Sequence, residues 1–153
     1  MSDYPLHKVS PEWAQRAYVN SEQAVDMYQQ SMADPEGFWG QQGKRLDWMK
    51  PYTQVKDVNF DVKDLHIKWF HDGTLNVCHN CVDRHLPEKA QDTAIIWEGD
   101  DPNDDKTLTY SELKDQVSKF ANVLKDMGVQ KGDVVTLYMP MLVEASLAML
   151  ACA

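Results

Sequence analysis

The sequence predicts an α/β fold for its last third, preceded by a wrapping segment of short helices and a hairpin. Three observations in residues 107–153 support this prediction. Thr109 and Glu112 have the spacing of a capping box, which starts a helix. Apolar residues then recur at helical spacing, at Leu113, Val117, Phe120, Ala121, Leu124 and Met127, and Gly128 follows where a helix commonly ends. Residues 134–139 are nearly all apolar, which is typical of a strand covered on both faces in a parallel sheet.

A second helix is expected from Met141 onward, and it is apolar almost all round, with only Glu144 and Ser146 as polar residues. A helix of this kind must be buried. It reaches Ala153 without the Gly, Asn or Pro that usually ends a helix. We therefore expect the chain to be the beginning of a longer protein, with its βαβ part truncated. The alternative is a small complete protein whose last helix docks on its own sheet.

Three helices are expected in the N-terminal part. Ser10-Pro11 predicts a helix within residues 10–20, because proline is favoured at the first helical position. Residues 21–32 predict a second helix that docks through Ala24, Val25, Tyr28 and Met32. Asp34-Pro35 predicts a third, in which Phe38 and Trp39 fill a core.

The predicted hairpin follows a mixed, polar stretch. Residues 52–64 indicate an extended segment across the surface, and residues 67–70 a strand. His71-Asp72-Gly73 contains the Asp-Gly pair of a tight turn, so residues 74–77 are expected to return as the second strand.

The regular part is expected to begin near residue 93. Residues 76–86 predict a helix or a capped turn, and residues 93–97 a strand that pairs antiparallel with residues 107–109. Residues 100–105 form an acidic loop rich in turn-forming residues.

Composition excludes several classes of function. The net charge of −9 and the isoelectric point near 4.9 argue against nucleic acid or an anionic membrane as partner, because both require a basic surface. The first residues lack the basic start and apolar run of a signal peptide, and no stretch is long and apolar enough to span a membrane. Three cysteines fit a reducing cytoplasm better than a secreted disulfide framework.

Cys78 and Cys81 form a Cys-x-x-Cys pair, with His79 and His85 nearby. The pair is half of a structural zinc site, which normally needs a second pair of ligands. Only His85 and a distant histidine such as His71 are available, at no recognised spacing. A redox disulfide is also disfavoured, because the surroundings do not match a thioredoxin-like unit. We expect instead that Cys81 packs as a small apolar residue and that Cys78 has no special role.

The triplet Asp83-Arg84-His85 allows two interpretations. His85 could be a general base, but no nucleophile motif adjoins it. The favoured alternative is a structural network in which Asp83 pairs with Arg84 and His85 donates to a backbone carbonyl. Similarly, the acidic loop at residues 100–105 lacks the ligand pattern of a calcium loop and is expected to be a solvated tip. The tryptophans are expected to be core residues rather than ligand platforms: Trp39, Trp48, Trp69 and Trp97.

Eight segments of the chain stand in the order found in the acetyl-coenzyme A synthetase family, which belongs to the adenylate-forming acyl-CoA synthetases. The resemblance covers the chain after about residue 19, and the segment TAIIWEGDD favours acetyl- over propionyl-CoA synthetases. The segments are 34–40 (DPEGFWG), 46–52 (LDWMKPY), 67–75 (IKWFHDGTL), 76–86 (NVCHNCVDRHL), 93–101 (TAIIWEGDD), 107–113 (TLTYSEL), 131–140 (KGDVVTLYMP) and 148–153 (AMLACA).

This resemblance implies a domain organisation: an N-terminal tail at residues 1–20, a family-specific N-terminal extension at 21–90, and the incomplete beginning of the AMP-binding domain at 91–153. It also implies a cytoplasmic, AMP-forming ligase. Acetate attacks the α-phosphate of Mg-ATP to give acetyl-adenylate and pyrophosphate, and coenzyme A then displaces AMP to give acetyl-CoA.

In the family, the phosphate loop, adenine-binding motif, acyl pocket and catalytic lysine all come later than the segments matched here. The resemblance therefore assigns no catalytic, cofactor-binding or metal-binding residue to this chain. It implies that these residues alone are inactive, bind no ATP, Mg²⁺ or coenzyme A, and need the C-terminal remainder of the same chain. The alternatives are a part of a propionyl-CoA synthetase, a free-standing interaction module that uses the apolar edge, and a metal-binding module through Cys78 and Cys81.

Overall fold

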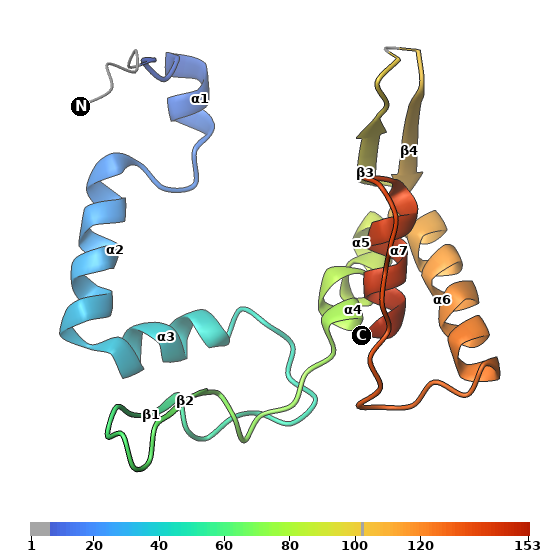
Figure 1. Cartoon of the computed structure of the whole chain (residues 1–153). Helices are drawn as coiled ribbons and strands as arrows, with labels where there is room; N and C mark the ends of the chain where they lie inside the picture. The colour runs from blue at the N-terminus through green and yellow to red at the C-terminus, as the bar shows by residue number, and fades with distance from the viewer. Residues whose placement is uncertain (1–6, 102) are drawn as a thin grey trace. The chain divides into compact units, whose positions relative to one another are not determined.

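The computed structural model describes residues 7–101 and 103–153, and it divides into two compact units (Figure 1). The first unit contains Met1–Arg45 and Thr53–His71, and the second contains Leu46–Tyr52 and Asp72–Ala153. The chain thus contributes a short segment, Leu46–Tyr52, to the second unit before it completes the first.

The helices of the first unit begin where their capping residues predict. In α1 (Pro11–Arg16), Ser10 is the N-cap and its hydroxyl accepts from the Trp13 amide. In α3 (Pro35–Gly43), an Asp34 carboxylate oxygen accepts from the Gly37 amide at 3.0 Å. In α2 (Ser21–Ala33), a capping box joins Asn20 and Gln23.

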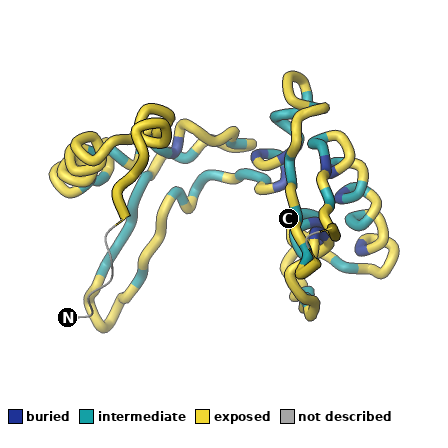
Figure 2. Tube along the Cα trace, turned by 90° about the horizontal axis from the view of Figure 1, so that it is seen from above, coloured by how far each residue is buried: buried dark blue, intermediate teal, exposed yellow. Residues whose placement is uncertain are grey.

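The apolar side chains of these helices are less covered than expected. Val25, Tyr28 and Met32 on α2 are exposed, so the prediction that this face is docked is not met. Trp39 is also exposed, although its ring meets the Phe38 and Trp69 rings edge-on. Within the described part of this unit only Gly43 is buried, so these residues form an aromatic cluster rather than a closed core (Figure 2).

The hairpin prediction was wrong about its position. The observed hairpin pairs β1 (Lys56–Asn59) with β2 (His66–Trp69), antiparallel, with Asn59 opposite His66. Side-chain turns close the loop between them, because Asn59 Oδ1 accepts from the Asp61 amide and Asp61 Oδ1 accepts from the Lys63 amide, both at 2.9 Å.

The Asp72-Gly73 pair serves a different purpose. Thr74 pairs with Lys50 in an isolated antiparallel bridge, which joins the segment Leu46–Tyr52 to the rest of the second unit. A Cβ atom at Gly73 would lie 2.7 Å from the Trp48 ring, so glycine is required here by close packing rather than by a hairpin turn.

The second unit begins with α4 (Val77–Cys81), a 3₁₀ turn η1 (Asp83–His85) and α5 (Leu86–Lys89). The strands β3 (Thr93–Glu98) and β4 (Asp105–Thr109) pair antiparallel, as predicted. They lead into α6 (Tyr110–Asp126), which packs against α7 (Val143–Cys152).

Local signals around α6 are confirmed. The Glu112 amide donates to Thr109 Oγ1 at 3.2 Å and a Glu112 carboxylate oxygen accepts from the Thr109 amide at 2.8 Å, which completes the capping box. Gly128 adopts a φ of +86°, the left-handed conformation expected after a helix.

The core of the second unit joins α4 to the strands and the long helices (Figure 2). Val82 in this core is fully buried. Its buried members are Cys78, Val82, Leu108, Leu113, Val117, Val143 and Leu147.

The α/β class is confirmed, but the strand expected at residues 134–139 is not formed. Among the described residues, none of the backbone groups of 134–139 makes a backbone hydrogen bond, because no neighbouring strand is present to pair with. Val134 and Tyr138 are 91% and 100% exposed. The helix α7 starts at Val143 rather than Met141 and is buried on one side only, since Met149 is exposed.

No helix among the described residues is long and apolar enough to cross a membrane.

Candidate functional site

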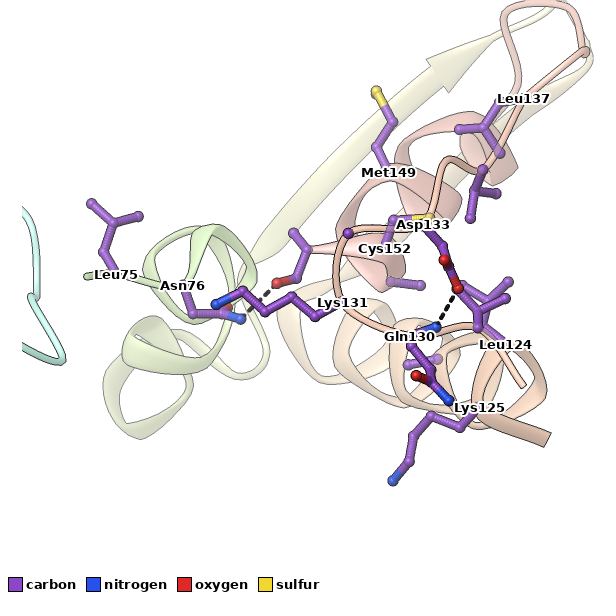
Figure 3. Close-up of a pocket in the computed structure, with 16 residues that line it drawn as sticks. Leu75, Asn76, Leu124, Lys125, Gln130, Lys131, Asp133, Leu137, Met149 and Cys152 are labelled. Atoms are coloured by element: carbon purple, nitrogen blue, oxygen red, sulfur yellow. Dashed lines mark hydrogen bonds between the residues drawn. The ribbon is translucent and has the colours of Figure 1, made fainter. Parts of the chain in front are cut away.

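A pocket of about 750 Å³ lies in the second unit between α6, the loop that follows it, and α7 (Figure 3). Its apolar lining residues include Leu124, Val135 and Leu137. Polar groups lie at the loop, where the Gln130 amide donates to an Asp133 carboxylate oxygen at 2.8 Å. Its lining is therefore mixed, with apolar side chains beside the amide of Asn76 and the charged groups of Lys131 and Asp133.

A polar network fastens the segment Leu46–Tyr52 to α4. Asn80 is buried, and its side-chain amide exchanges two hydrogen bonds with the backbone of Asp47, at 2.9 and 3.0 Å. Arg84 donates to Asn80 Oδ1 at 3.0 Å and lies 3.7 Å from the Asp47 carboxylate. His79 Nε2 is 3.6 Å from the other Asp47 oxygen. Asp47 thereby meets three side chains of the segment that runs from α4 to η1.

Of the triplet Asp83-Arg84-His85, only Arg84 belongs to this network, and the partners of the triplet differ from those predicted. Asp83 pairs with Lys114 of α6 rather than with Arg84. The His85 ring packs on the Tyr110 ring, with centroids 5.4 Å apart. Each member of the triplet points to a different neighbour, because a 3₁₀ turn spreads consecutive side chains about 120° apart.

The two cysteines have the reverse of their predicted roles. Cys78 packs in the core and Cys81 is exposed. Burial raises the pKa of the Cys78 thiol, with the nearby Asp83 carboxylate as a smaller cause. Within residues 7–101 and 103–153, no group of three or more histidine, cysteine and acidic side chains is arranged to hold a metal ion.

The acidic loop is closed by its own side chains. Asp101 Oδ1 accepts from the backbone and side-chain amides of Asn103, at 2.9 and 3.0 Å, and these bonds lower the pKa of Asp101. Pro102 lies outside the described residues. The tip is exposed, which agrees with the predicted solvated loop.

The tryptophans of the second unit tie segments together. Trp97 Nε1 donates to the Met141 carbonyl at 2.7 Å, which anchors the approach to α7, and its half-buried ring packs against the core. Trp48 meets the Tyr52 ring edge-on at 4.9 Å.

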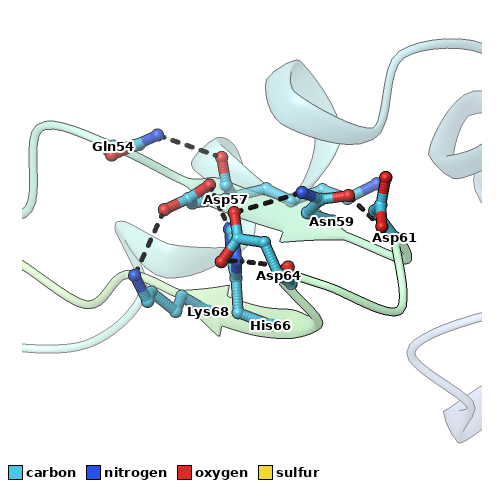
Figure 4. Close-up of polar contacts among 8 residues, drawn as sticks. Gln54, Asp57, Asn59, Asp61, Asp64, His66 and Lys68 are labelled. Atoms are coloured by element: carbon cyan, nitrogen blue, oxygen red, sulfur yellow. Dashed lines mark hydrogen bonds and ion pairs between the residues drawn. The ribbon is translucent and has the colours of Figure 1, made fainter.

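The first unit contains a polar cluster that sequence reasoning missed (Figure 4). On the hairpin, His66 Nε2 is 3.0 Å from Asp57 Oδ1, and His66 Nδ1 is 3.3 Å from Asp64 Oδ1. Lys68 Nζ lies 3.6 Å from the other Asp57 oxygen. The hydrogen bond between His66 and Asp57 raises the pKa of His66 and lowers that of Asp57. The pairing of β1 with β2 brings Asp57 to His66 and Lys68, whereas the predicted hairpin paired residues 67–70 with residues 74–77.

Two family models match adjacent segments of the chain. The model described as "Acetyl-coenzyme A synthetase N-terminus" matches residues 25–81, and the model described as "AMP-binding enzyme" matches residues 82–153. Curated acetyl-coenzyme A synthetases match along the whole chain, which confirms the resemblance. The chain belongs to the acetyl-coenzyme A synthetase family.

Relatives within this family are similar throughout. The acetyl-coenzyme A synthetases of Shewanella amazonensis and Parvibaculum lavamentivorans are 59% and 58% identical over 153 residues, 100% of this chain and 24% of each relative. The chain therefore spans about a quarter of the length of the curated relatives it matches. A solved acetoacetyl-CoA synthetase from Streptomyces lividans shares the fold, with a TM-score of 0.71 and 24% identity over 91% of this chain and 21% of that one.

The two matched segments share one core. Cys78 and Asn80 lie in the part that matches the synthetase N-terminus, whereas Val82, Leu113 and Leu147 lie in the part that matches the AMP-binding enzymes. Because Cys78 packs with the latter three, the end of the N-terminal segment is built into the second unit.

Proposed function

We propose that this chain is the N-terminal part of an AMP-forming acetate–CoA ligase. The enzyme makes acetyl-CoA from acetate, ATP and coenzyme A through acetyl-adenylate, and releases AMP and pyrophosphate. The observation that carries the proposal is the identity of 55–59% to acetyl-coenzyme A synthetases along the whole chain.

The role of these residues within the enzyme is structural. Residues 21–90 form the family-specific extension after a tail at 1–20, and residues 91–153 open the AMP-binding domain. The packing of Cys78 with Leu113 and Leu147 supports this role, because it joins the end of the extension to the α/β part.

The proposal places the sites for Mg-ATP and coenzyme A in the remainder of the enzyme. It is supported by the sequence, which contains no Walker-type phosphate loop. We therefore assign no catalytic residue to this chain. Its three free cysteines accord with a cytoplasmic enzyme.

A second candidate, a free-standing interaction module, is favoured by one observation. The segment 134–142 exposes Val134, Tyr138 and Met141 almost completely, and large exposed apolar patches mark interaction sites. In the ligase the same surface would be covered by the remainder of the chain.

A chimaera distinguishes these functions. The aligned residues of the Shewanella amazonensis synthetase are replaced by this chain, and acetate-dependent exchange between ATP and pyrophosphate is measured. We expect exchange from the chimaera and none from the 153-residue chain alone. A folded, monodisperse chimaera without exchange would refute the ligase assignment.

A control variant carries a surface substitution that should not affect the exchange rate. Val62 is 96% exposed in the hairpin loop, so a chimaera that carries Val62→Ser should keep the exchange rate of the parent chimaera.

A further inference from the structure

The hairpin of the first unit places one histidine between two carboxylates from different segments (Figure 4). His66 lies on β2, Asp57 on β1, and Asp64 in the loop that joins the strands. The distances are 3.0 Å from Nε2 to Asp57 and 3.3 Å from Nδ1 to Asp64. The Asp64 carbonyl oxygen is also 3.1 Å from Nδ1.

Every close partner of the His66 ring is an acceptor. An ionised carboxylate and a backbone carbonyl accept hydrogen bonds and donate none. A neutral imidazole has one N–H, so it can donate to only one of the two sides and must turn a lone pair toward an acceptor on the other. The imidazolium has two N–H groups and satisfies both sides at once.

The remaining charged and polar groups around the ring reinforce this preference. Lys68 on β2 lies 3.6 Å from Asp57 and helps to keep that carboxylate ionised. Asn59 on β1 donates to the second Asp64 oxygen at 3.2 Å, a bond that does not depend on the charge of His66.

We propose that His66, Asp57 and Asp64 form a pH-dependent clasp that fastens the hairpin loop to β1 when His66 is protonated and loosens it when His66 is neutral. The clasp is a conformational switch in the N-terminal extension. It concerns no substrate and does not depend on the ligase assignment.

The pH range in which the clasp is closed depends on the pKa values of His66 and Asp57. The hydrogen bond with Asp57 is the main cause that raises the pKa of His66 above its ordinary value, so the clasp is complete below about pH 6.5 and opens as pH rises through the raised pKa. The same bond lowers the pKa of Asp57, so that side stays ionised until pH falls through that lowered pKa. The clasp is therefore closed in mildly acidic solution and opens toward alkaline pH.

Mass spectrometry on the whole chain, at low protein concentration, can test both the titration of His66 and the loosening of the loop. Exchange of the imidazole C2 hydrogen reports the titration midpoint of His66, in the native chain and in urea. Amide exchange of residues 60–65, divided by the rate of an unstructured peptide of the same sequence, reports the loop. We expect a higher native midpoint, and a roughly two- to fivefold loss of amide protection as pH passes it, the range for exposed charge pairs.

Three variants distinguish the effect of the clasp from a general destabilisation of the first unit. Asp57→Asn should lower the His66 midpoint toward its value in urea. Asp64→Asn, in the exposed loop, should reduce the pH dependence of the loop amides while leaving the strands paired. Asp26→Asn, which changes an exposed carboxylate on α2, should alter neither quantity.

The decisive variant is His66→Gln, which has no titrating ring. Its loop protection should be independent of pH. The proposal is overturned if the His66 midpoint is equal in the native and denatured chain, or if loop protection in His66→Gln still changes with pH as in the parent chain. If His66→Gln does not fold, Asp64→Asn takes its place. Loop protection in Asp64→Asn that still changes with pH as in the parent chain then overturns the proposal.

Discussion

Asn80 and Asp47 are separated by 33 positions in the sequence, yet they share two hydrogen bonds between the buried Asn80 side chain and the Asp47 backbone. The Asn80 side-chain oxygen accepts from the Asp47 amide, and its NH₂ group donates to the Asp47 carbonyl, so it bonds the backbone as a paired strand would. The bridge between Lys50 and Thr74 is a further link. These contacts explain how a segment from within the N-terminal part belongs to the second unit.

Replacement of Asn80 by alanine should release this segment. The change removes two hydrogen bonds to the backbone of Asp47, and because Asp47 is exposed to water each loss should cost about 0.5–1.5 kcal/mol. We expect faster amide exchange in residues 46–52, measured by mass spectrometry on the whole chain. Asn103→Ala, in the acidic loop, is the control and should leave this segment unchanged; equal effects of the two would contradict the proposed anchor.

Leu113→Ala tests whether the two matched segments share a core. Leu113 is buried on α6, and truncation of a buried leucine costs about 2–5 kcal/mol. Because the cluster includes Cys78, exchange should accelerate in α4 as well as in α6. Met127→Ala at the end of the same helix, where the side chain is 75% exposed, should change protection by less than about 0.5 kcal/mol. An effect of Leu113→Ala confined to α6 would argue against a shared core.

The capping box at the start of α6 predicts a pH effect. Hydrogen bonds from the Thr109 amide and hydroxyl lower the pKa of Glu112, so its contribution is present above its unfolded pKa and is lost as pH falls through the lowered value. Amide protection in the first turn of α6 should therefore fall at acidic pH in the parent chain.

Two variants check this capping effect. Glu112→Gln should make the protection of the first turn independent of pH in this range. Thr109→Ala should lower it at all pH values, by about 1 kcal/mol for the loss of an N-cap. Retention of the acid-induced change in Glu112→Gln would assign it to another group.

The exposed apolar segment after α6 should bind hydrophobic dye. Val134 and Tyr138 present their side chains to solvent, and such surface promotes dye binding and self-association. We expect the double change Val134→Thr and Tyr138→Thr to reduce dye fluorescence and aggregation of the chain. Val62→Ser removes one exposed apolar side chain elsewhere and should have little effect. A monomeric chain with a sharp melt and no dye binding would contradict this prediction.

The features that could be predicted from the sequence are those determined by a few neighbouring residues. Ser10, Asp34 and Thr109 each start a helix because a side-chain oxygen satisfies a free amide within three positions. Gly128 ends α6 for an equally local reason. The antiparallel pair β3–β4 was also predictable, because an apolar run at residues 94–97 and the β-prone residues 107–109 flank a turn-rich loop.

The features that depend on distant contacts were not predictable in this way. The Asp72-Gly73 pair has the chemistry of a hairpin turn, but Gly73 is needed for its contact with Trp48 and the hairpin forms upstream. Residues 134–139 have the composition of a strand, but a strand requires a partner to bond its backbone. The clasp at His66 depends on the register of β1 and β2, which composition alone does not determine.

The most direct measurement of the central claim is acetate-dependent ATP–pyrophosphate exchange by the chimaera that carries this chain in place of the aligned quarter of the Shewanella amazonensis synthetase. The account predicts exchange that requires acetate and that Asn80→Ala weakens. A chimaera that folds but shows no acetate-dependent exchange would contradict it.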